Sequence, residues 1–525
     1  MNTKLFTLLL ALSSGGTITA QSFSVDDVNY EITSKDKLEV QVTGGSTTAS
    51  SITIPDVVSF EGKDYRVTSI YGMSFSGYTK LDEIYIGNNV ATIGENAFSN
   101  CSSLDKVVIG DGLKEIKESA FFQCGSLKEI NISPSVENIG DYAFCLCSDL
   151  KDITISDAVS YIGKLAFHDC YSLSSIDVSS GNKSFVSVDG VLYNYDKTTL
   201  IKYPQGKSDK TFSVPEGVKR IEERALNNAP YLEEAYISAS VEEIGDLAFT
   251  VSDRLKAINV ASDNQHFTSD NGILFTKDKS TLICYPRNKT DITSYTVPAE
   301  TEQIEGWAFY GCHTLTDIKL PENISTIADR TFMYCIGLKN INIPREVKSI
   351  GSEAFKRCIS LEQIKLPNKV ATIGNEAFCT CSKISTIEFP ASIVSIGDYA
   401  FSGTYLTSIY CNATVPPMIT SYTFENTDPN IPIYVPFDYI SDYEMAIGWS
   451  SFMNYQEIPA SIQSTEMSEG ISFNGNRVIN SEKAEISIFD MNGRMFYKGN
   501  GAEISMPSGT YIINTGKGHT CKVTF

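Results

Sequence analysis

The sequence predicts a solenoid of short parallel strands and single helical turns, in which repeats of 23 residues stack as successive coils. Three observations predict this fold. The pattern V-x-x-I-G-x-x-A-F-x-x-C-x-x-L-x-x-I-x-I-P recurs twelve times, and most repeats start 23 residues after the previous one. Its ninth position is phenylalanine in eleven of the twelve repeats. A unit this short cannot bury its apolar face alone, so the repeats must stack on one another.

Each repeat is numbered here from its own first position. In a repeat, the apolar residues at positions eighteen and twenty flank one exposed residue, which is the period-two pattern of a strand. The glycine common at position five, as in Gly94 and Gly140, predicts a turn with positive φ. The Ala-Phe pair that follows is consistent with one helical turn. The repeats begin at Val67, Val90, Leu113, Val136, Val159, Val218, Val241, Thr301, Ile324, Val347, Val370 and Ile393.

The phenylalanines and most cysteines are predicted to be core residues. Phenylalanines at one position in successive coils should stack into a continuous spine. Position twelve holds cysteine in eight repeats and Ala229 or Ser252 in two others, so it accepts a small inward-facing group and predicts buried free thiols. Disulfides between neighbouring coils remain the alternative for an exported chain. The eight cysteines are Cys101, Cys124, Cys147, Cys170, Cys312, Cys335, Cys358 and Cys381.

Two inserts interrupt the repeats, at residues 182–217 and 264–300. Asp189-Gly190 in the first and Asn271-Gly272 in the second are tight hairpin signals between strand-like runs. Each insert is therefore predicted to be a small β-meander that projects from the solenoid wall or extends it.

The first twenty residues resemble a secretory signal peptide. Lys4 is followed by an apolar run from Leu5 to Leu12, and Ala20 is a small residue at the expected cleavage site. The sequence therefore predicts an exported protein, secreted or held at the outer cell surface, with the periplasm as the alternative. The predicted segments are a signal peptide (1–20), an N-terminal β cap (21–66), the repeat array (67–410), its C-terminal cap (411–460), a linker (461–470) and a small all-β domain (471–525).

Composition and motifs exclude several function classes. The net charge of −21 argues against nucleic acid and anionic lipid as partners, since both require basic patches. The sequence has four histidines and lacks H-E-x-x-H, G-x-S-x-G and phosphate-loop motifs. The C-x-C pairs that end at Cys147 and Cys381 lack a second pair at zinc spacing. We therefore predict no enzymatic activity, no catalytic residues, no metal and no cofactor.

The best candidates for binding are the exposed residues at position nineteen, between the two apolar residues of each strand. Repeat proteins commonly bind partners through such an extended face. Proteins are the favoured ligands and glycans the alternative, while a hydrolase with its site in an insert is less favoured because no catalytic pair is visible there. The candidates are Tyr85, Asn131, Tyr236, Asn259, Lys319, Asn342, Lys365 and Tyr410.

The repeat motif, the insert segment from Phe185 and the tail IYVPFDYISDYEMAIGWSSF resemble the BspA-type leucine-rich repeat proteins, exported proteins of Bacteroidetes-like bacteria. The resemblance covers roughly residues 23–460 and implies a curved, right-handed leucine-rich repeat solenoid at the cell surface. It also implies adhesion to host matrix proteins and other cells. The last segment, with Asp490, Asn492-Gly493 and Gly509-Thr510-Tyr511, is similar to the sorting domains of type IX secretion cargo, although Phe525 replaces their basic final residue. A plain structural β-domain is the alternative.

Overall fold

The computed structural model describes residues 21–458, 471–473, 477–481, 483–490, 493–507, 510–515 and 520–524. The predicted signal peptide and the linker at 461–470 lie outside these residues, as do Asn492, Gly509 and Phe525. The chain forms two compact units. The first comprises residues 1–324 and 330–338, and the second comprises residues 325–329 and 339–525.

Most regular coils contribute two strands, where the sequence pattern predicted one. The longer strand lies at positions seventeen to twenty, and a two-residue strand lies at positions three and four. The short strand has a single buried isoleucine, so it carries no period-two signal. In the first unit the long strands are β4 (Ser51–Ile54), β7 (Glu83–Ile86), β9 (Lys106–Ile109), β11 (Glu129–Ile130), β13 (Asp152–Ile155) and β15 (Ser175–Val178), and the short strands are β8 (Thr92–Ile93), β10 (Glu115–Ile116), β12 (Asn138–Ile139) and β14 (Tyr161–Ile162).

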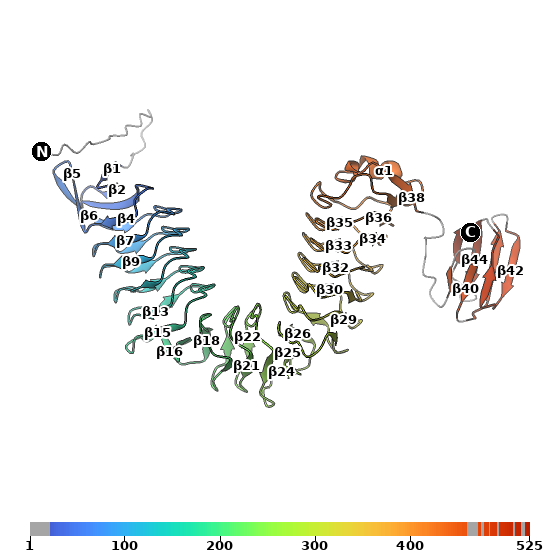
Figure 1. Ribbon diagram of the computed structural model, residues 1–525, viewed down its shortest axis with the longest axis horizontal. Coiled ribbons are helices and arrows are strands. Elements are labelled where there is room, and N and C mark those ends of the chain that lie inside the picture. The colour runs from blue at the N-terminus through green and yellow to red at the C-terminus, as the bar shows by residue number, and fades with distance from the viewer. Residues whose placement is uncertain are drawn as a thin grey trace. The chain divides into compact units, whose positions relative to one another are not determined.

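These strands form two parallel sheets that run along the first unit, as the stacked coils in Figure 1 show. The short-strand sheet continues directly from an N-terminal cap of longer strands. In that cap β3 pairs in parallel with β6, and the other pairs are antiparallel. The cap strands are β1 (Ser22–Val25), β2 (Val28–Ser34), β3 (Glu39–Gly45), β5 (Val57–Phe60) and β6 (Lys63–Ile70).

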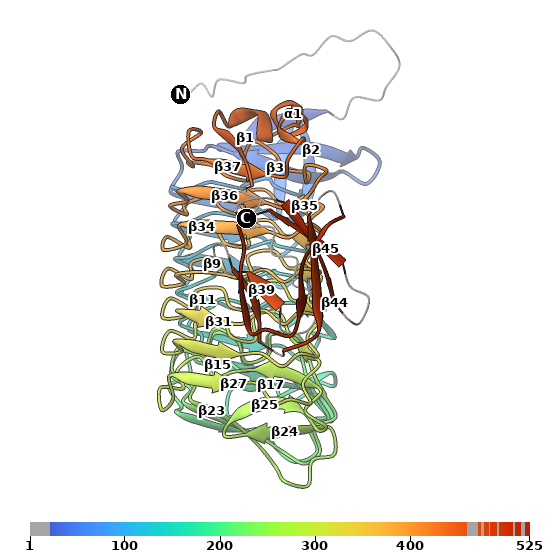
Figure 2. The same cartoon turned by 90° about the vertical axis from the view of Figure 1, so that its right-hand side faces the viewer.

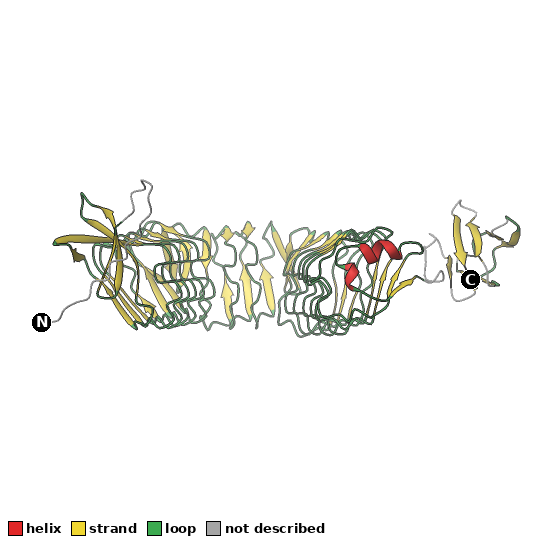
Figure 3. Ribbon diagram, turned by 90° about the horizontal axis from the view of Figure 1, so that it is seen from above, coloured by secondary structure: helices red, strands yellow, loops and turns green. Residues whose placement is uncertain are grey.

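The prediction of a helical turn in each coil is wrong. The segment 94–101 is a series of turns, in which Asn96 has φ 56° and Asn100 has φ 62°. A positive φ cannot belong to a right-handed helix. The turns instead link neighbouring coils, because the N–H of Phe98 donates to the carbonyl oxygen of Ala120 in the next coil at 2.8 Å. Among the described residues, helical ribbon occurs only in the C-terminal cap of the array (Figure 3).

The glycines at position five also serve another purpose than predicted, because their φ angles are not positive. A Cβ atom on Gly94 would lie 2.6 Å from the amide nitrogen of Gly72 and 2.8 Å from the carbonyl oxygen of Ile70. On Gly163 it would lie 2.3 Å from the amide nitrogen of Asp141. Real Cβ atoms do not approach backbone so closely, so glycine is required here by the close contact between coils.

The core is a phenylalanine spine flanked by a row of thiols. Rings of Phe75, Phe98 and Phe121 stack at 5.2 Å and within 7° of parallel. The Sγ–H of Cys124 donates to the carbonyl oxygen of Phe98 at 3.1 Å, and other position-twelve cysteines repeat this bond one coil further on. The twelve cysteines whose side chains the structure describes are all free thiols, which includes the eight predicted at position twelve. The bond from position-twelve thiols to the spine was not indicated by the sequence.

The inserts extend the wall of the solenoid. In the first, a three-stranded antiparallel meander ends in β18, which pairs in parallel with the short strand of the next coil. The second repeats this arrangement. Their strands and neighbours are β16 (Phe185–Val188), β17 (Val191–Asn194), β18 (Thr199–Lys202), β19 (Thr211–Ser213), β20 (Arg220–Ile221), β21 (Glu234–Ile237), β22 (Glu243–Ile244), β23 (Ala257–Val260), β24 (Phe267–Asp270), β25 (Ile273–Thr276), β26 (Thr281–Cys284), β27 (Ser294–Thr296), β28 (Gln303–Ile304) and β29 (Asp317–Lys319).

Each insert also completes a coil of its own. The N–H of Tyr203 donates to the carbonyl oxygen of Ala225, and the N–H of Tyr285 donates to that of Ala308. Most phenylalanines of the spine make the same bond to the alanine of the next coil. The ring of Tyr285 stacks on Phe309 at 5.1 Å. The inserts therefore supply tyrosine where the regular coils have phenylalanine.

In the second unit the coils have the same construction. Figure 2 shows β34 and β36 on one side of the coil and β35 on the other. The short strands are β30 (Thr326–Ile327), β32 (Ser349–Ile350), β33 (Thr372–Ile373) and β35 (Ser395–Ile396), and the others are β31 (Asn340–Ile341), β34 (Thr386–Phe389), β36 (Ser408–Cys411), β37 (Ile433–Val435) and β38 (Tyr455–Glu457). The array ends with α1 (Ile440–Met445) and η1 (Trp449–Ser451), where the buried indole of Trp449 donates to the carbonyl oxygen of Pro417 at 2.9 Å.

The C-terminal residues form two antiparallel sheets around a small apolar core of their own. Val478 and Ile486 are fully buried in this core, together with Ile488 and Ile513. The strands are β39 (Ile471–Phe473), β40 (Arg477–Asn480), β41 (Ile486–Asp490), β42 (Met495–Gly499), β43 (Glu503–Ser505), β44 (Thr510–Thr515) and β45 (Thr520–Thr524).

Candidate functional site

Five of the eight predicted binding residues lie on the long strands, but the structure distributes them over separate sheets. In the first sheet Tyr85 pairs directly with Val108, and Thr154 pairs with Asp177. Tyr236 and Asn259 are partners in another sheet, and Lys319 pairs with Thr296 in a third. Glu388 and Tyr410 are partners in the second unit. Side chains of neighbouring coils on one sheet are thus brought side by side at the spacing of parallel strands, roughly 5 Å.

Three predicted residues lie beyond regular strand. Asn131 follows β11 and Asn342 follows β31, while Lys365 lies in a coil that has no long strand. All three are exposed. The outer face is therefore less regular than the repeat pattern indicates.

The tyrosines on this face are engaged by their neighbours. The hydroxyl of Tyr85 donates to Glu83 at 2.7 Å, and the ammonium of Lys106 lies 5.4 Å from the centre of its ring. The hydroxyl of Tyr236 donates to Glu234 at 2.5 Å. In the second unit, the ring of Tyr410 stacks on that of Tyr434 at 4.4 Å. These tyrosines belong to three sheets and do not form one aromatic platform.

Two cysteines lie next to a histidine in the sequence, Cys170 near His168 and Cys312 beside His313. Neither pair is suited to act as nucleophile and base. The Sγ–H of Cys170 donates to the carbonyl oxygen of Phe144 at 3.1 Å, and burial raises the pKa of this thiol to about 12. Burial also raises the pKa of Cys312 well above its ordinary value. Both groups are therefore protonated thiols at neutral pH, and a thiol is a poor nucleophile.

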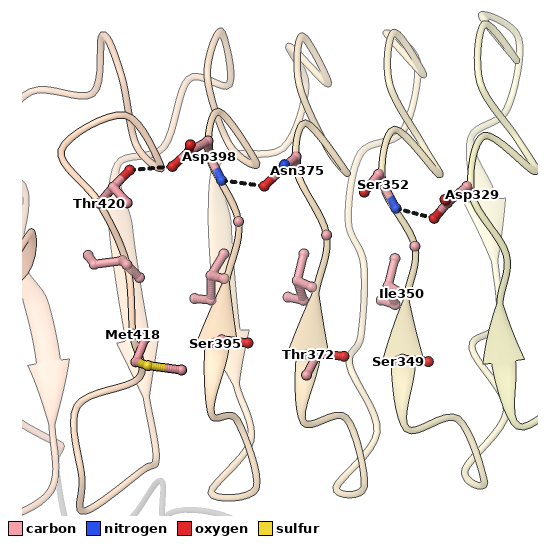
Figure 4. A pocket seen from close by; sticks show the side chains of 16 residues that line it. Asp329, Ser349, Ile350, Ser352, Thr372, Asn375, Ser395, Asp398, Met418 and Thr420 are labelled. Carbon is pink, nitrogen blue, oxygen red and sulfur yellow. Dashed lines mark hydrogen bonds between the residues drawn. The ribbon is translucent and has the colours of Figure 1, made fainter.

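A groove that the sequence analysis missed lies along the short strands of the second unit (Figure 4). It has a volume of about 540 Å³ and a floor of position-five glycines. Ser349, Thr372 and Ser395 line one side, and residues at position six line the other. The recurring glycine followed by a polar residue was the available signal, but glycine was interpreted as a requirement of backbone conformation.

The position-six residues of the groove bond from coil to coil. The carboxylate of Asp329 accepts the N–H of Ser352 at 2.7 Å, and the amide oxygen of Asn375 accepts the N–H of Asp398 at 2.9 Å. The hydroxyl of Thr420 donates to Asp398 at 2.5 Å. Figure 4 shows this row opposite the hydroxyl row, and Met418 lies at the end of the hydroxyl row. The groove can hydrogen-bond an extended polar chain, but its position-six oxygens are already used within the fold.

None of the described His, Cys, Asp and Glu side chains gather in a group of three or more that could hold a metal ion. Within the same residues, every helix is too short or too polar to cross a membrane.

The family of this chain follows from its repeats. The model of the "BspA type Leucine rich repeat region" matches residues 68–188, 205–281, 284–407, 325–443 and 395–523. The chain belongs to the BspA-type leucine-rich repeat family. This membership accounts for the repeat sequence through both units and agrees with the resemblance found in the motifs.

Several solved structures are similar to the chain. A leucine-rich repeat protein from Bacteroides ovatus is 27% identical over 83% of this chain and 99% of its own, with a TM-score of 0.42. The pneumococcal vaccine antigen PcpA is 21% identical over 84% and 100%, with a TM-score of 0.45. A leucine-rich repeat protein from Eubacterium ventriosum is 22% identical over 73% and 94%, with a TM-score of 0.46. No curated protein sequence matches the chain significantly.

Proposed function

We propose that this protein is an exported, non-catalytic binding protein of the adhesin type, which recognises protein partners through the outer face of its long strands. The observation that carries the proposal is the direct pairing of position-nineteen residues, such as Thr154 with Asp177, across neighbouring coils. Within each sheet these side chains form a surface of mixed polarity. A flat surface of this kind suits a protein partner better than a small molecule, which needs a concave pocket.

Protein is favoured over glycan by the state of the tyrosines. A glycan platform requires free aromatic faces in a row, whereas Tyr85 lies beneath Lys106 and Tyr410 is stacked on Tyr434. A hydrolytic site in an insert is disfavoured because the insert strands are built into the solenoid wall.

Export and partner class are tested together. Full-length mature protein is screened against extracellular matrix proteins, intact cells and a glycan array, while cell fractionation locates the native protein. We expect binding to at least one matrix protein or cell type, and recovery at the cell surface or in the medium. Retention in the periplasm with no binding on any panel would contradict the proposal.

The face is tested by a matched pair of variants. Thr154→Arg places a large charged side chain on β13, next to the edge strand β15 of the six-stranded sheet, and Thr79→Arg makes the same change at an exposed turn outside the strands. We expect Thr154→Arg to reduce partner binding at least ten-fold and Thr79→Arg to leave it unchanged. Equal effects of the two variants would place the binding surface elsewhere, and loss of glycan binding in Tyr236→Ala would favour a glycan ligand.

A further inference from the structure

The two inserts create two equivalent clefts in the first unit. At each insert the short strand of the preceding coil and the last meander strand belong to different sheets, so a gap opens between them. The first cleft lies between β14 and β18, and the second between β22 and β26. The lining residues of the first cleft recur at matching positions in the second, since Ile162, Phe167 and Ile201 match Ile244, Phe249 and Ile283.

The first cleft is filled by side chains of the protein itself. Its volume is only about 40 Å³. Lys202 is 7% exposed and lines it, with its ammonium donating to the carbonyl oxygen of Arg224 at 3.3 Å. His168, 9% exposed, fills another wall. A buried lysine is rare in proteins, so this cleft is built to accept an ammonium and its methylene stem.

The second cleft has the same frame, with smaller residues at three positions and Trp307 in place of Arg224, and its volume is about 460 Å³. Cys284 replaces the lysine and Thr250 replaces the histidine. Gly306 stands where the first cleft has Glu223. The space that the chain fills for itself at the first insert is therefore open at the second.

Charge indicates what the second cleft accepts. Its lining contains the carboxylates of Glu223, Asp246 and Glu305 and no basic side chain. Glu223 lies 3.8 Å from the guanidinium of Arg224, whereas no described ion pair involves Asp246 or Glu305. Burial, with a contribution from the charge of Asp246, raises the pKa of Glu305. The side chains of Asp246 and Glu305 are both exposed, so a cation from outside the chain can reach them.

The rest of the lining is apolar. Phe249 and Phe267 are buried, and Ile244, Ile283 and the indole of Trp307 are half-buried. A bare metal ion would leave these apolar side chains exposed to water, whereas the alkyl stem of a larger cation would cover them.

We propose that the cleft at the second insert binds the side chain of a lysine presented by a partner protein. The ammonium faces Asp246 and Glu305, and the methylenes lie along Phe249 and Ile283. Lys202 in the equivalent cleft is the internal counterpart of this ligand. The proposal does not depend on the outer face of the long strands, so either can fail without the other.

The probe is the end-blocked tripeptide acetyl-Ala-Lys-Ala-amide, titrated against the full mature chain by ligand-observed NMR. Trp307 fluorescence is a second readout, since the other tryptophan, Trp449, is fully buried. We expect saturable binding with a dissociation constant of about 1 mM or lower, and at least ten-fold weaker binding of the Nε-acetylated peptide.

Variants separate the site from general acidity. The isosteric double variant Asp246→Asn with Glu305→Gln should weaken binding about ten-fold or more, whereas Glu300→Gln, an exposed carboxylate of the same insert outside the cleft, should not change it. Thr250→His with Cys284→Lys, which copies the first cleft into the second, should abolish binding. The proposal is overturned by no saturable binding at about 10 mM peptide, by equal binding of the acetylated peptide, by tighter binding of the arginine analogue, or by an unaffected double carboxylate variant.

Discussion

Between Val90 and Val159 each coil lies directly against the one before it, whereas at the two inserts neighbouring short strands belong to different sheets. Most of the regular coils have glycine at position five, as at Gly140 and Gly163, although Lys117 occupies it in the coil that begins at Leu113. The coils that follow the inserts have Glu222 and Glu305 there instead. The difference teaches that contact between coils, rather than the internal conformation of a coil, determines this position. The N–H groups of Glu222 and Glu305 still donate to the carbonyl oxygens of Leu200 and Leu282, so a charged side chain fits at this position where the preceding strand belongs to an insert.

The largest difference in stability between the regular coils and the coils at the inserts should appear in the phenylalanine spine. Phe121 stacks on a ring at 5.2 Å on one side and at 5.4 Å on the other, while Leu226 follows the first insert. Phe121→Ala should lower the free energy of unfolding by about 3 to 5 kcal/mol, because it removes a buried ring and leaves a cavity. Leu226→Ala should cost about 2 to 3 kcal/mol. Urea denaturation measures both, and a larger loss for Leu226→Ala would contradict a special role for the continuous stack.

The second difference concerns how the stability of the two clefts depends on pH. Burial, followed by the charge of Lys202, lowers the pKa of His168 in the first cleft to about 4, although Asp169 opposes the shift. The unfolded chain therefore takes up a proton near pH 6.5 that the folded chain resists until about pH 4. This histidine should reduce stability progressively as the pH falls from about 6.5 to about 4, by up to about 3 kcal/mol, and by no more below that.

His168→Thr, which copies Thr250 of the second cleft, tests this dependence. Its unfolding free energy should decline less than that of the wild type between pH 7 and pH 4. Cys124→Ser is the control, since burial raises the pKa of that thiol and neither side chain titrates in this range. Parallel pH profiles for His168→Thr and the wild type would show that His168 is already protonated or solvated in the folded protein.

The third difference tests the contact between coils. A methyl group on Gly140 would meet the amide nitrogen of Glu118 at 2.5 Å, whereas on Gly125 the nearest atom would be the hydroxyl of Ser148 at 3.5 Å. Gly140→Ala should therefore destabilise the protein by about 1 to 3 kcal/mol, measured by thermal unfolding, through overpacking. Gly125→Ala should change stability by less than about 1 kcal/mol and is the matched control. Equal effects would indicate that backbone entropy, rather than close contact, governs both sites.

These residues also show how far the sequence could predict the molecule. The spine and the buried thiols followed from the repeat alone, because every coil places the same side chain against the same neighbour. The role of Gly140 could not be predicted from the repeat. Glycine is favoured both by a positive φ and by a close approach of two backbone segments, and only the distance to Glu118 distinguishes the two causes. The short strand was missed because its two residues, such as Thr92 and Ile93, are too few to display a period.

Of the candidate sites, likewise, one could be predicted from the sequence and the other could not. Position-nineteen residues such as Tyr85 were found because they alternate with buried neighbours within one strand. The clefts could not be found, since they depend on which strands fail to pair across an insert. Comparing the inserts residue by residue would have aligned Lys202 with Cys284, but only the coordinates show that both line a cavity.

The smallest expected effect concerns the thiol row. Because the Sγ–H of Cys124 already donates to the carbonyl oxygen of Phe98, a serine hydroxyl can replace it, as Ser252 does in donating to Leu226 at 3.3 Å. Cys124→Ser should therefore cost less than about 1 kcal/mol in unfolding free energy, while Cys124→Val, which leaves that carbonyl without its donor, should cost about 1 to 3 kcal/mol. Both values come from urea denaturation under reducing conditions. If Val is tolerated better than Ser, the thiol acts in the regular coils only as an apolar filler, and its bond to the spine contributes nothing to holding one coil on the next.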